Sequence, residues 1–170
     1  NLVTKKLSEV SGFPLTRAKN LVEATQNAGA FVQMSASLKR AAVQISKICN
    51  DLRWMSSGPR CGLNEINLPA MQPGSSIMPG KVNPVIPEAM NQTAYQVIAS
   101  DLAVTLAAEA GQLQLNAMEP MIIYNVLNSL KMLKEACQML ETRCIRGITA
   151  NEAVCAGHVE NSIGIITALV

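Results

Sequence analysis

The apolar residues between positions 31 and 55 recur at alternating spacings of three and four, and this pattern restricts the fold most. The series comprises Phe31, Met34, Leu38, Ala41, Ile45, Ile48, Leu52 and Met55. Such a heptad pattern predicts a helix with one packed face, and residues 31–55 would form a rod roughly 37 Å long. The pattern fits a core stripe in a helix bundle, which we favour, or a separate coiled coil.

Two more long helices are predicted downstream. The first covers residues 84–110, with Asn83 as N-cap, Pro84 at the first helical position and Gly111 after its end. Because it is apolar on nearly every side, we expect it to be buried all round, with help from helices of other subunits. The second is expected from near Glu119 to near Arg143, with a stripe of Ile123, Val126, Leu130, Leu133, Cys137 and Leu140. Beyond Gly147, residues 149–152 resemble a capping box for a further short helix.

Composition agrees with an all-α fold of long antiparallel helices. Hydrophobic residues make up 49% of the chain but aromatic residues only 3%, so the core must be aliphatic, and we find no strand alternation. The 15% of charged residues is low for a free-standing domain, which suggests self-association. A net charge of +2 does not suggest a nucleic-acid partner, and no apolar run is long enough to span a membrane.

The five cysteines are odd in number and show no metal-ligand spacing. We therefore expect reduced thiols, a cytoplasmic protein, no metal site and no cofactor.

A long Gly/Pro-rich segment, residues 56–83, separates the first two long helices. Loops of this length inside a domain are usually functional or disordered. Within it, Ser75 and Ser76 stand between two Pro-Gly pairs, and Lys81 and Asn83 follow at the start of a helix, a good receptor for a carboxylate. On these grounds alone a plain surface loop or a phosphate cradle remains open, although the spacing fits neither a Walker A loop nor a G-x-S-x-G elbow.

Residues 74–84 together with Glu88 match the pattern GSSxMPxKxNxxxxE, the signature of the fumarase/aspartase superfamily. Residues 57–63 resemble the stretch that precedes this signature in the superfamily. Residues 112–120, 147–151 and 161–165 resemble the aspartase branch, whereas fumarases tend to carry an aromatic-Arg-Pro variant at the first of these places. The resemblance covers essentially the whole chain.

The resemblance implies a role for each matching residue. Ser75 would be the catalytic base that removes a Cβ proton from L-aspartate, giving an aci-carboxylate intermediate and then fumarate and ammonia. Ser76 would bind the substrate β-carboxylate, and Lys81 and Asn83 the α-carboxylate. Ile77 and Met78 would complete the substrate-binding set, and backbone N–H groups near them would stabilise the alkoxide of the serine base. The flanking Gly74 and Gly80 would be supporting residues, as would Glu88, which would orient a histidine.

It also implies an architecture. Residues 1–170 would be part of the central helical domain of a homotetrameric lyase, with the serine loop at about 70–83. The chain would be an internal piece without the N-terminal and small C-terminal domains. Family sites combine loops from three subunits, and His158 is not the expected catalytic histidine, so we expect the isolated chain to be inactive. The alternatives are a class II fumarate hydratase and a helical oligomerisation module without chemistry of its own.

Overall fold

The computed structural model describes residues 2–74, 77–78 and 80–169. Its elements are α1 (Leu2–Ser11), α2 (Leu21–Gln26), α3 (Gly29–Met55), β1 (Ile66–Asn67), α4 (Val85–Glu109), α5 (Glu119–Arg143), η1 (Ile145–Gly147), β2 (Thr149–Ala150), α6 (Glu152–Glu160) and η2 (Ile163–Leu169). The predicted all-α class is confirmed, because apart from one two-stranded sheet the described elements are helices.

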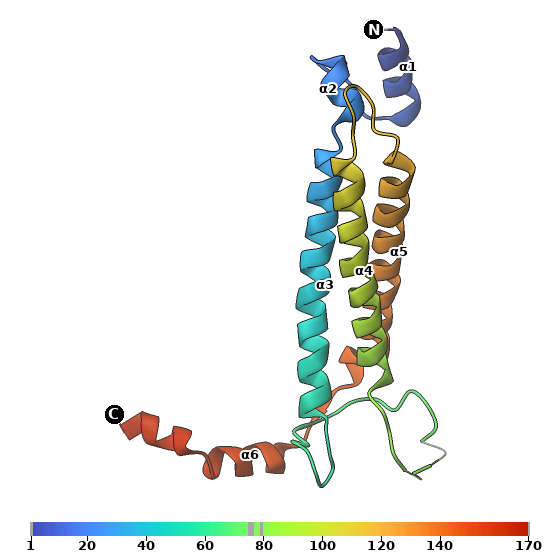
Figure 1. Cartoon of the computed structure of the whole chain (residues 1–170). Helices are drawn as coiled ribbons and strands as arrows, with labels where there is room; N and C mark the ends of the chain where they lie inside the picture. Colours follow the sequence, from blue (N-terminus) through green and yellow to red (C-terminus); the bar gives the residue numbers. More distant parts are fainter. Residues whose placement is uncertain (1, 75–76, 79, 170) are drawn as a thin grey trace.

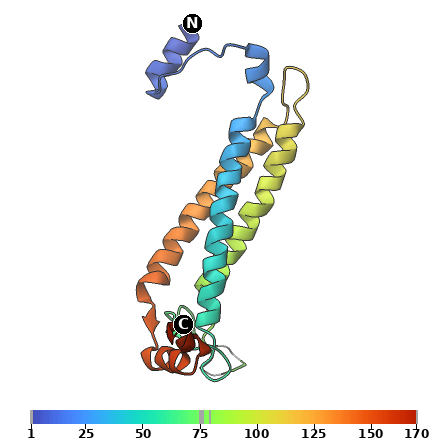
Figure 2. The same ribbon diagram turned by 90° about the vertical axis from the view of Figure 1, so that its left-hand side faces the viewer.

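Three long helices run side by side, with α4 packed between α3 and α5 and each reversing the direction of the one before (Figure 1). The loop between β1 and α4 and the C-terminal elements lie at one end of the bundle, and the loop between α4 and α5 lies at the other (Figures 1 and 2). This arrangement fixes which loops meet within one chain.

The predicted helix boundaries agree closely with those observed. The third long helix spans Glu119–Arg143 as expected. The second begins at Val85, one residue later than predicted, because Pro84 has a non-helical ψ of 60° and is itself the N-cap. Because Pro84 holds the N-cap position and Asn83 makes no capping hydrogen bond among the described residues, the N-cap assignment to Asn83 is wrong. Gly111 follows the helix end, where a Cβ atom would lie 3.1 Å from Gln26 Oε1.

The buried face of α3 differs from the predicted seam. Its buried residues are Ser35, Ala42, Ser46, Cys49 and Leu52, of which only Leu52 belongs to the heptad series. Phe31 and Ile48 of that series are 38% and 50% exposed. Small side chains on the inner face let α3 approach α4 closely, while the larger seam residues lie along the edge of the contact.

The expectation that α4 is buried on all sides is wrong within this chain. One face is buried, but Tyr95, Leu102 and Leu106 on the other are 55%, 61% and 58% exposed. The predicted α5 stripe needs a smaller correction, since Ile122 is buried and Ile123 is 39% exposed. Three helices packed against one another bury only the surfaces between them, so the outer faces stay open.

Polar groups also link α3 to α4 inside the bundle. Asp101 accepts hydrogen bonds from Lys39 Nζ at 2.5 Å and Ser35 Oγ at 2.8 Å. Asn91 Nδ2 donates to the Ser46 carbonyl oxygen at 3.1 Å and to Ser46 Oγ at 2.7 Å. These directional contacts set the register of the two helices, whereas the aliphatic contacts alone would tolerate sliding.

A two-stranded antiparallel sheet, which the sequence did not reveal, joins the long loop to the C-terminal part. Ile66 pairs with Ala150, and Asn67 pairs with Thr149. The predicted capping box is wrong, because Thr149 lies in β2 and the Asn151 side chain donates to the Asn64 carbonyl oxygen at 2.8 Å instead of capping α6. Strands of two residues are too short to show alternation.

All five cysteines are free, as expected. Burial raises the pKa of Cys49 from 9.0 to about 11, with smaller contributions from the neighbouring Cys144 and Cys137. Burial also raises the pKa of Cys144. Among the described residues, no helix combines the length and hydropathy needed to cross a membrane. In the same residues no group of His, Cys, Asp and Glu side chains could hold a metal ion.

We expect the chain to lose stability between about pH 9 and pH 11 because of Cys49. The unfolded thiol ionises near pH 9, whereas the native thiol keeps its proton to about pH 11. The stabilisation is therefore complete below pH 9 and is lost as the pH rises, by about 2 kcal/mol from this residue. Urea unfolding at pH 8, 9, 10 and 11 measures the loss. Cys49→Ala should remove most of this loss of stability with rising pH. If the variant lost as much stability as the wild type, the assignment of the loss to Cys49 would be wrong.

Candidate active site

The serine loop leaves the bundle after β1 and returns at α4 (Figure 1). Ser75 and Ser76, the expected base and its neighbour, lie outside the described residues. The ends of the loop lie against each other, since a Cβ atom on Gly74 would be 3.1 Å from the Lys81 carbonyl oxygen. Gly80 has a φ of 81°, a backbone conformation that favours glycine. Glycine therefore suits both positions: the space at Gly74 is tight for a Cβ atom, and the φ at Gly80 is one that other residues rarely adopt.

Lys81 and Asn83 line a cavity of about 470 Å³ beside the serine loop. Its lining also includes Arg53 in the last turn of α3 and residues 56–59, 64 and 66–70. No Asp or Glu is among the described residues that line it, whereas Lys81 and Arg53 both do. The cavity is therefore electropositive and suited to a carboxylate or another anion.

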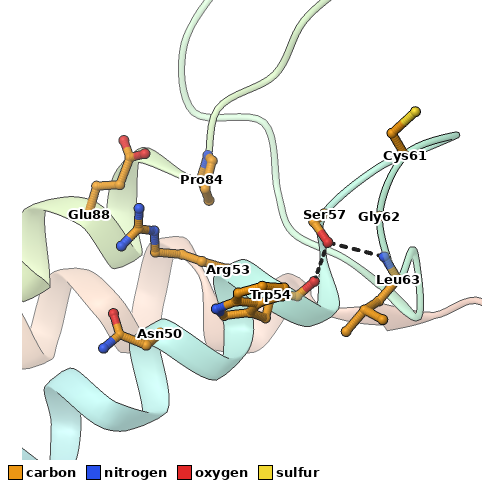
Figure 3. Close-up of a pocket in the computed structure, with 9 residues that line it drawn as sticks. All are labelled: Asn50, Arg53, Trp54, Ser57, Cys61, Gly62, Leu63, Pro84 and Glu88. Carbon is orange, nitrogen blue, oxygen red and sulfur yellow. Dashed lines mark hydrogen bonds between the residues drawn. The ribbon is translucent and has the colours of Figure 1, made fainter.

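Glu88 lines a neighbouring cavity of about 600 Å³ on the other side of Pro84. Figure 3 shows the Glu88 carboxylate near the Arg53 guanidinium, with Trp54 and Leu63 farther along the wall. Ser57 shapes the turn at this wall, since its Oγ donates to the Trp54 carbonyl oxygen at 2.5 Å and accepts from the Leu63 N–H at 3.1 Å. Within the described residues, Glu88 thus adjoins the cavity of Lys81 and Asn83 without lining it.

Two other predicted features lie elsewhere. Residues 112–120, which favoured aspartases over fumarases, form most of the α4–α5 loop and the start of α5, at the opposite end of the bundle (Figure 1). There, buried Asn116 donates from Nδ2 to the Ala107 carbonyl oxygen at 3.0 Å. His158 lies on α6, where its Nδ1 is 3.1 Å from Glu65 Oε1 beside a separate cavity of about 540 Å³. The chain alone does not bring these features to the serine loop.

Ile77 and Met78, whose N–H groups are predicted to stabilise the serine alkoxide, are 87% and 51% exposed. The Met78 carbonyl oxygen accepts a hydrogen bond from the Lys81 N–H at 3.2 Å. Sequence reasoning missed Arg53, which lines both cavities. Its only sequence signal is a cation between Leu52 and Met55, the last two seam residues of α3, and a cation near a helix C-terminus is common.

Comparison with known proteins places the chain among lyases. A family model described as lyase matches residues 1–99. The chain is 62% identical over 169 residues to the aspartate ammonia-lyase of Helicobacter pylori strain 26695, covering 99% of this chain and 36% of that protein. It is 60% identical over 168 residues to the aspartate ammonia-lyase of Escherichia coli K12, covering 99% of this chain and 35% of that protein. The chain thus spans about a third of the length of these relatives.

Solved structures show the same fold. A fumarate lyase:delta crystallin from Brucella melitensis bound to cobalt aligns with a TM-score of 0.93 at 59% identity, covering 98% of this chain and 36% of that one. A class II fumarase from Schistosoma mansoni aligns with a TM-score of 0.89 at 31% identity, covering 99% of this chain and 37% of that one.

The helical bundle and the loop at its end thus define a class of helical lyases. Within that class, the chain belongs to the fumarase/aspartase superfamily and is aspartase-like.

Proposed function

We propose that the full-length protein is a carbon–nitrogen lyase that converts L-aspartate reversibly into fumarate and ammonia. The observation that carries this proposal is the electropositive cavity lined by Lys81 and Asn83 directly beside the serine loop. The sequence signature and the names of the relatives, at 60% and 62% identity, support the same reaction.

In the proposed mechanism, Ser75 removes a proton from Cβ of the substrate. The electron pair of the C–H bond moves into the adjacent carboxylate and forms an aci-carboxylate. The pair then returns to form the Cα–Cβ double bond while the C–N bond breaks and ammonia leaves. Serine is a weak base, so its alkoxide needs stabilisation by N–H groups near Ile77 and Met78 and a closed loop that excludes water.

Substrate binding follows the charges of the site. Ser76 binds the β-carboxylate, while Lys81 and Asn83 hold the α-carboxylate from the wall of the cavity. Glu88 orients a histidine that some other segment supplies, since His158 pairs with Glu65 beside another cavity.

We further propose that the chain self-associates through its helices into a homotetramer in the cytoplasm, without nucleic-acid or membrane partners, as part of amino-acid metabolism. The exposed apolar faces of α3 and α4 support this assembly, because Phe31, Tyr95, Leu102 and Leu106 remain between 38% and 61% exposed. A tetramer would also bring loops from opposite bundle ends together. As a piece of the central helical domain, the chain would then need other subunits to complete a site.

Fumarate hydratase is the second candidate, because a class II fumarase shares the fold at 31% identity. It would use a similar proton abstraction with water as the leaving group. The much higher identity to aspartate ammonia-lyases favours deamination.

One assay distinguishes the deamination of L-aspartate from the dehydration of L-malate. We expect the purified full-length protein to form fumarate, followed by its ultraviolet absorbance, from L-aspartate and not from L-malate. The 170-residue chain alone should form none, because a third of the relatives' length holds only part of the site. Turnover of malate without turnover of aspartate would overturn the proposed reaction, and full activity of the chain alone would overturn the need for other segments.

A further inference from the structure

Arg53 occupies the last turn of α3 and lines both cavities at the serine-loop end of the bundle. Its guanidinium extends towards the first turn of α4, near Pro84 and Glu88 (Figure 3). Because α3 and α4 pack along their length, this position is set by the bundle and not by the loop. Arg53 therefore presents a cation to the anion cavity from a rigid element.

The guanidinium makes no hydrogen bond or ion pair with any of the described residues, the nearby Glu88 included. An arginine side chain carries five N–H donors in a planar fork that matches a carboxylate. Those donors are thus available at the shared wall of the two cavities.

Lys81 supplies the other cation of the 470 Å³ cavity, whose described lining includes no acidic residue. Lys81 lies in the serine loop and Arg53 in the last turn of α3, so the two charges reach the cavity from different elements. A monocarboxylate can contact one of the two cations closely, whereas a dicarboxylate can contact both, so the second cation adds more affinity for a ligand with a second negative charge.

We propose that Arg53 is a specificity-determining residue of this cavity, which binds the second carboxylate of a dicarboxylate and so selects dianions over monoanions. This inference rests on the proposed dicarboxylate site and adds a residue to it. The simpler alternative is that Arg53 only places a favourable charge at the C-terminal end of α3.

Binding of succinate and of butanoate to the full-length protein, measured by calorimetry, tests the proposal. The two ligands have the same number of carbon atoms and differ by one carboxylate. We expect Arg53→Gln to weaken succinate binding roughly 10- to 100-fold, the loss of one charge-assisted contact, and butanoate binding less than about 3-fold. Arg53→Lys should restore most of the succinate affinity because it keeps the charge.

Arg60→Gln is the matched control, because Arg60 lies in the same part of the chain and lines neither cavity. It should leave both affinities unchanged. Equal weakening of both ligands by Arg53→Gln, or equal effects of the Arg53 and Arg60 variants on succinate, would overturn the proposal. If Arg53→Gln does not fold, it will bind neither ligand. The ratio of succinate affinity to butanoate affinity in Arg53→Lys then tests the proposal.

The readout is binding, so it separates this inference from the proposed reaction. A wild-type protein that binds succinate through Arg53 but does not deaminate aspartate would refute the reaction and keep the inference. In an active protein, Arg53→Gln should raise KM for L-aspartate by a similar factor with little change in kcat. A fall in kcat with KM unchanged would contradict a role in binding.

Discussion

Replacing Ser75 with alanine is expected to lower kcat for aspartate deamination about 10³-fold or more, with the helices still folded. A positioned acid–base group contributes typically 10² to 10⁴ in rate, and in the proposed mechanism no other group of the loop takes the Cβ proton. The formation of fumarate from L-aspartate, measured at saturating substrate in the full-length protein, gives kcat directly. Circular dichroism shows whether the helical content is kept.

Two companion variants make this result specific. Ser76→Ala should act mainly on KM, because Ser76 is assigned to the β-carboxylate. Ser37→Ala is a neutral control, since its hydroxyl is on the exposed surface of α3 and donates only to the Gln33 carbonyl oxygen of the same helix, at 2.9 Å. If Ser75→Ala kept its activity, Ser75 would not be the catalytic base.

Replacing Asp101 with alanine is expected to destabilise the fold by about 3 kcal/mol, the lower end of the cost of breaking a buried ion pair. The Asp101 side chain is only 7% exposed, and it accepts from both Lys39 Nζ and Ser35 Oγ. Its loss leaves the buried Ser35 hydroxyl without its acceptor on α4. Lys39, at 43% exposure, turns towards water and so limits the total cost. Urea unfolding monitored by circular dichroism measures the change.

Asp51→Ala is the matched control for Asp101→Ala. Asp51 pairs with Lys47 on the surface of α3, where both side chains are largely exposed. Such a pair contributes about 0.5 kcal/mol or less. Lys39→Met, alone and with Asp101→Ala, completes a double-mutant cycle that isolates the pair. If Asp101→Ala and Asp51→Ala proved equally mild, the buried pair would not hold α3 to α4.

The long helices were predictable because their signals are local. A helix forms from contacts three and four residues apart, so periodicity and flanking Pro and Gly residues locate α4 and α5 within a residue or two. The sheet formed by β1 and β2 was not predictable. It joins residues more than eighty positions apart, and two-residue strands carry no pattern of their own.

Part of the candidate site was also predictable from the sequence, and part was not. The run from Gly74 to Glu88 is contiguous, so its spacing alone identified the superfamily and the residues that match its chemistry. Arg53 is more than twenty positions upstream of that run and reaches the cavity only because α3 and α4 pack against each other. The spacing of residues along the sequence does not predict that Arg53 reaches this cavity.

The sequence by itself determined the three long helices, their approximate lengths and the superfamily, because all three depend on neighbours along the chain. Only the tertiary structure decided which face of α3 is buried, where small Ser35, Ala42 and Ser46 lie inside and the large seam residues lie at the edge. It also decided that residues 112–118 and the serine loop lie at opposite ends of the bundle. The helical period fixes which residues share a face, but the face that is buried depends on the shape of the partner that packs against it.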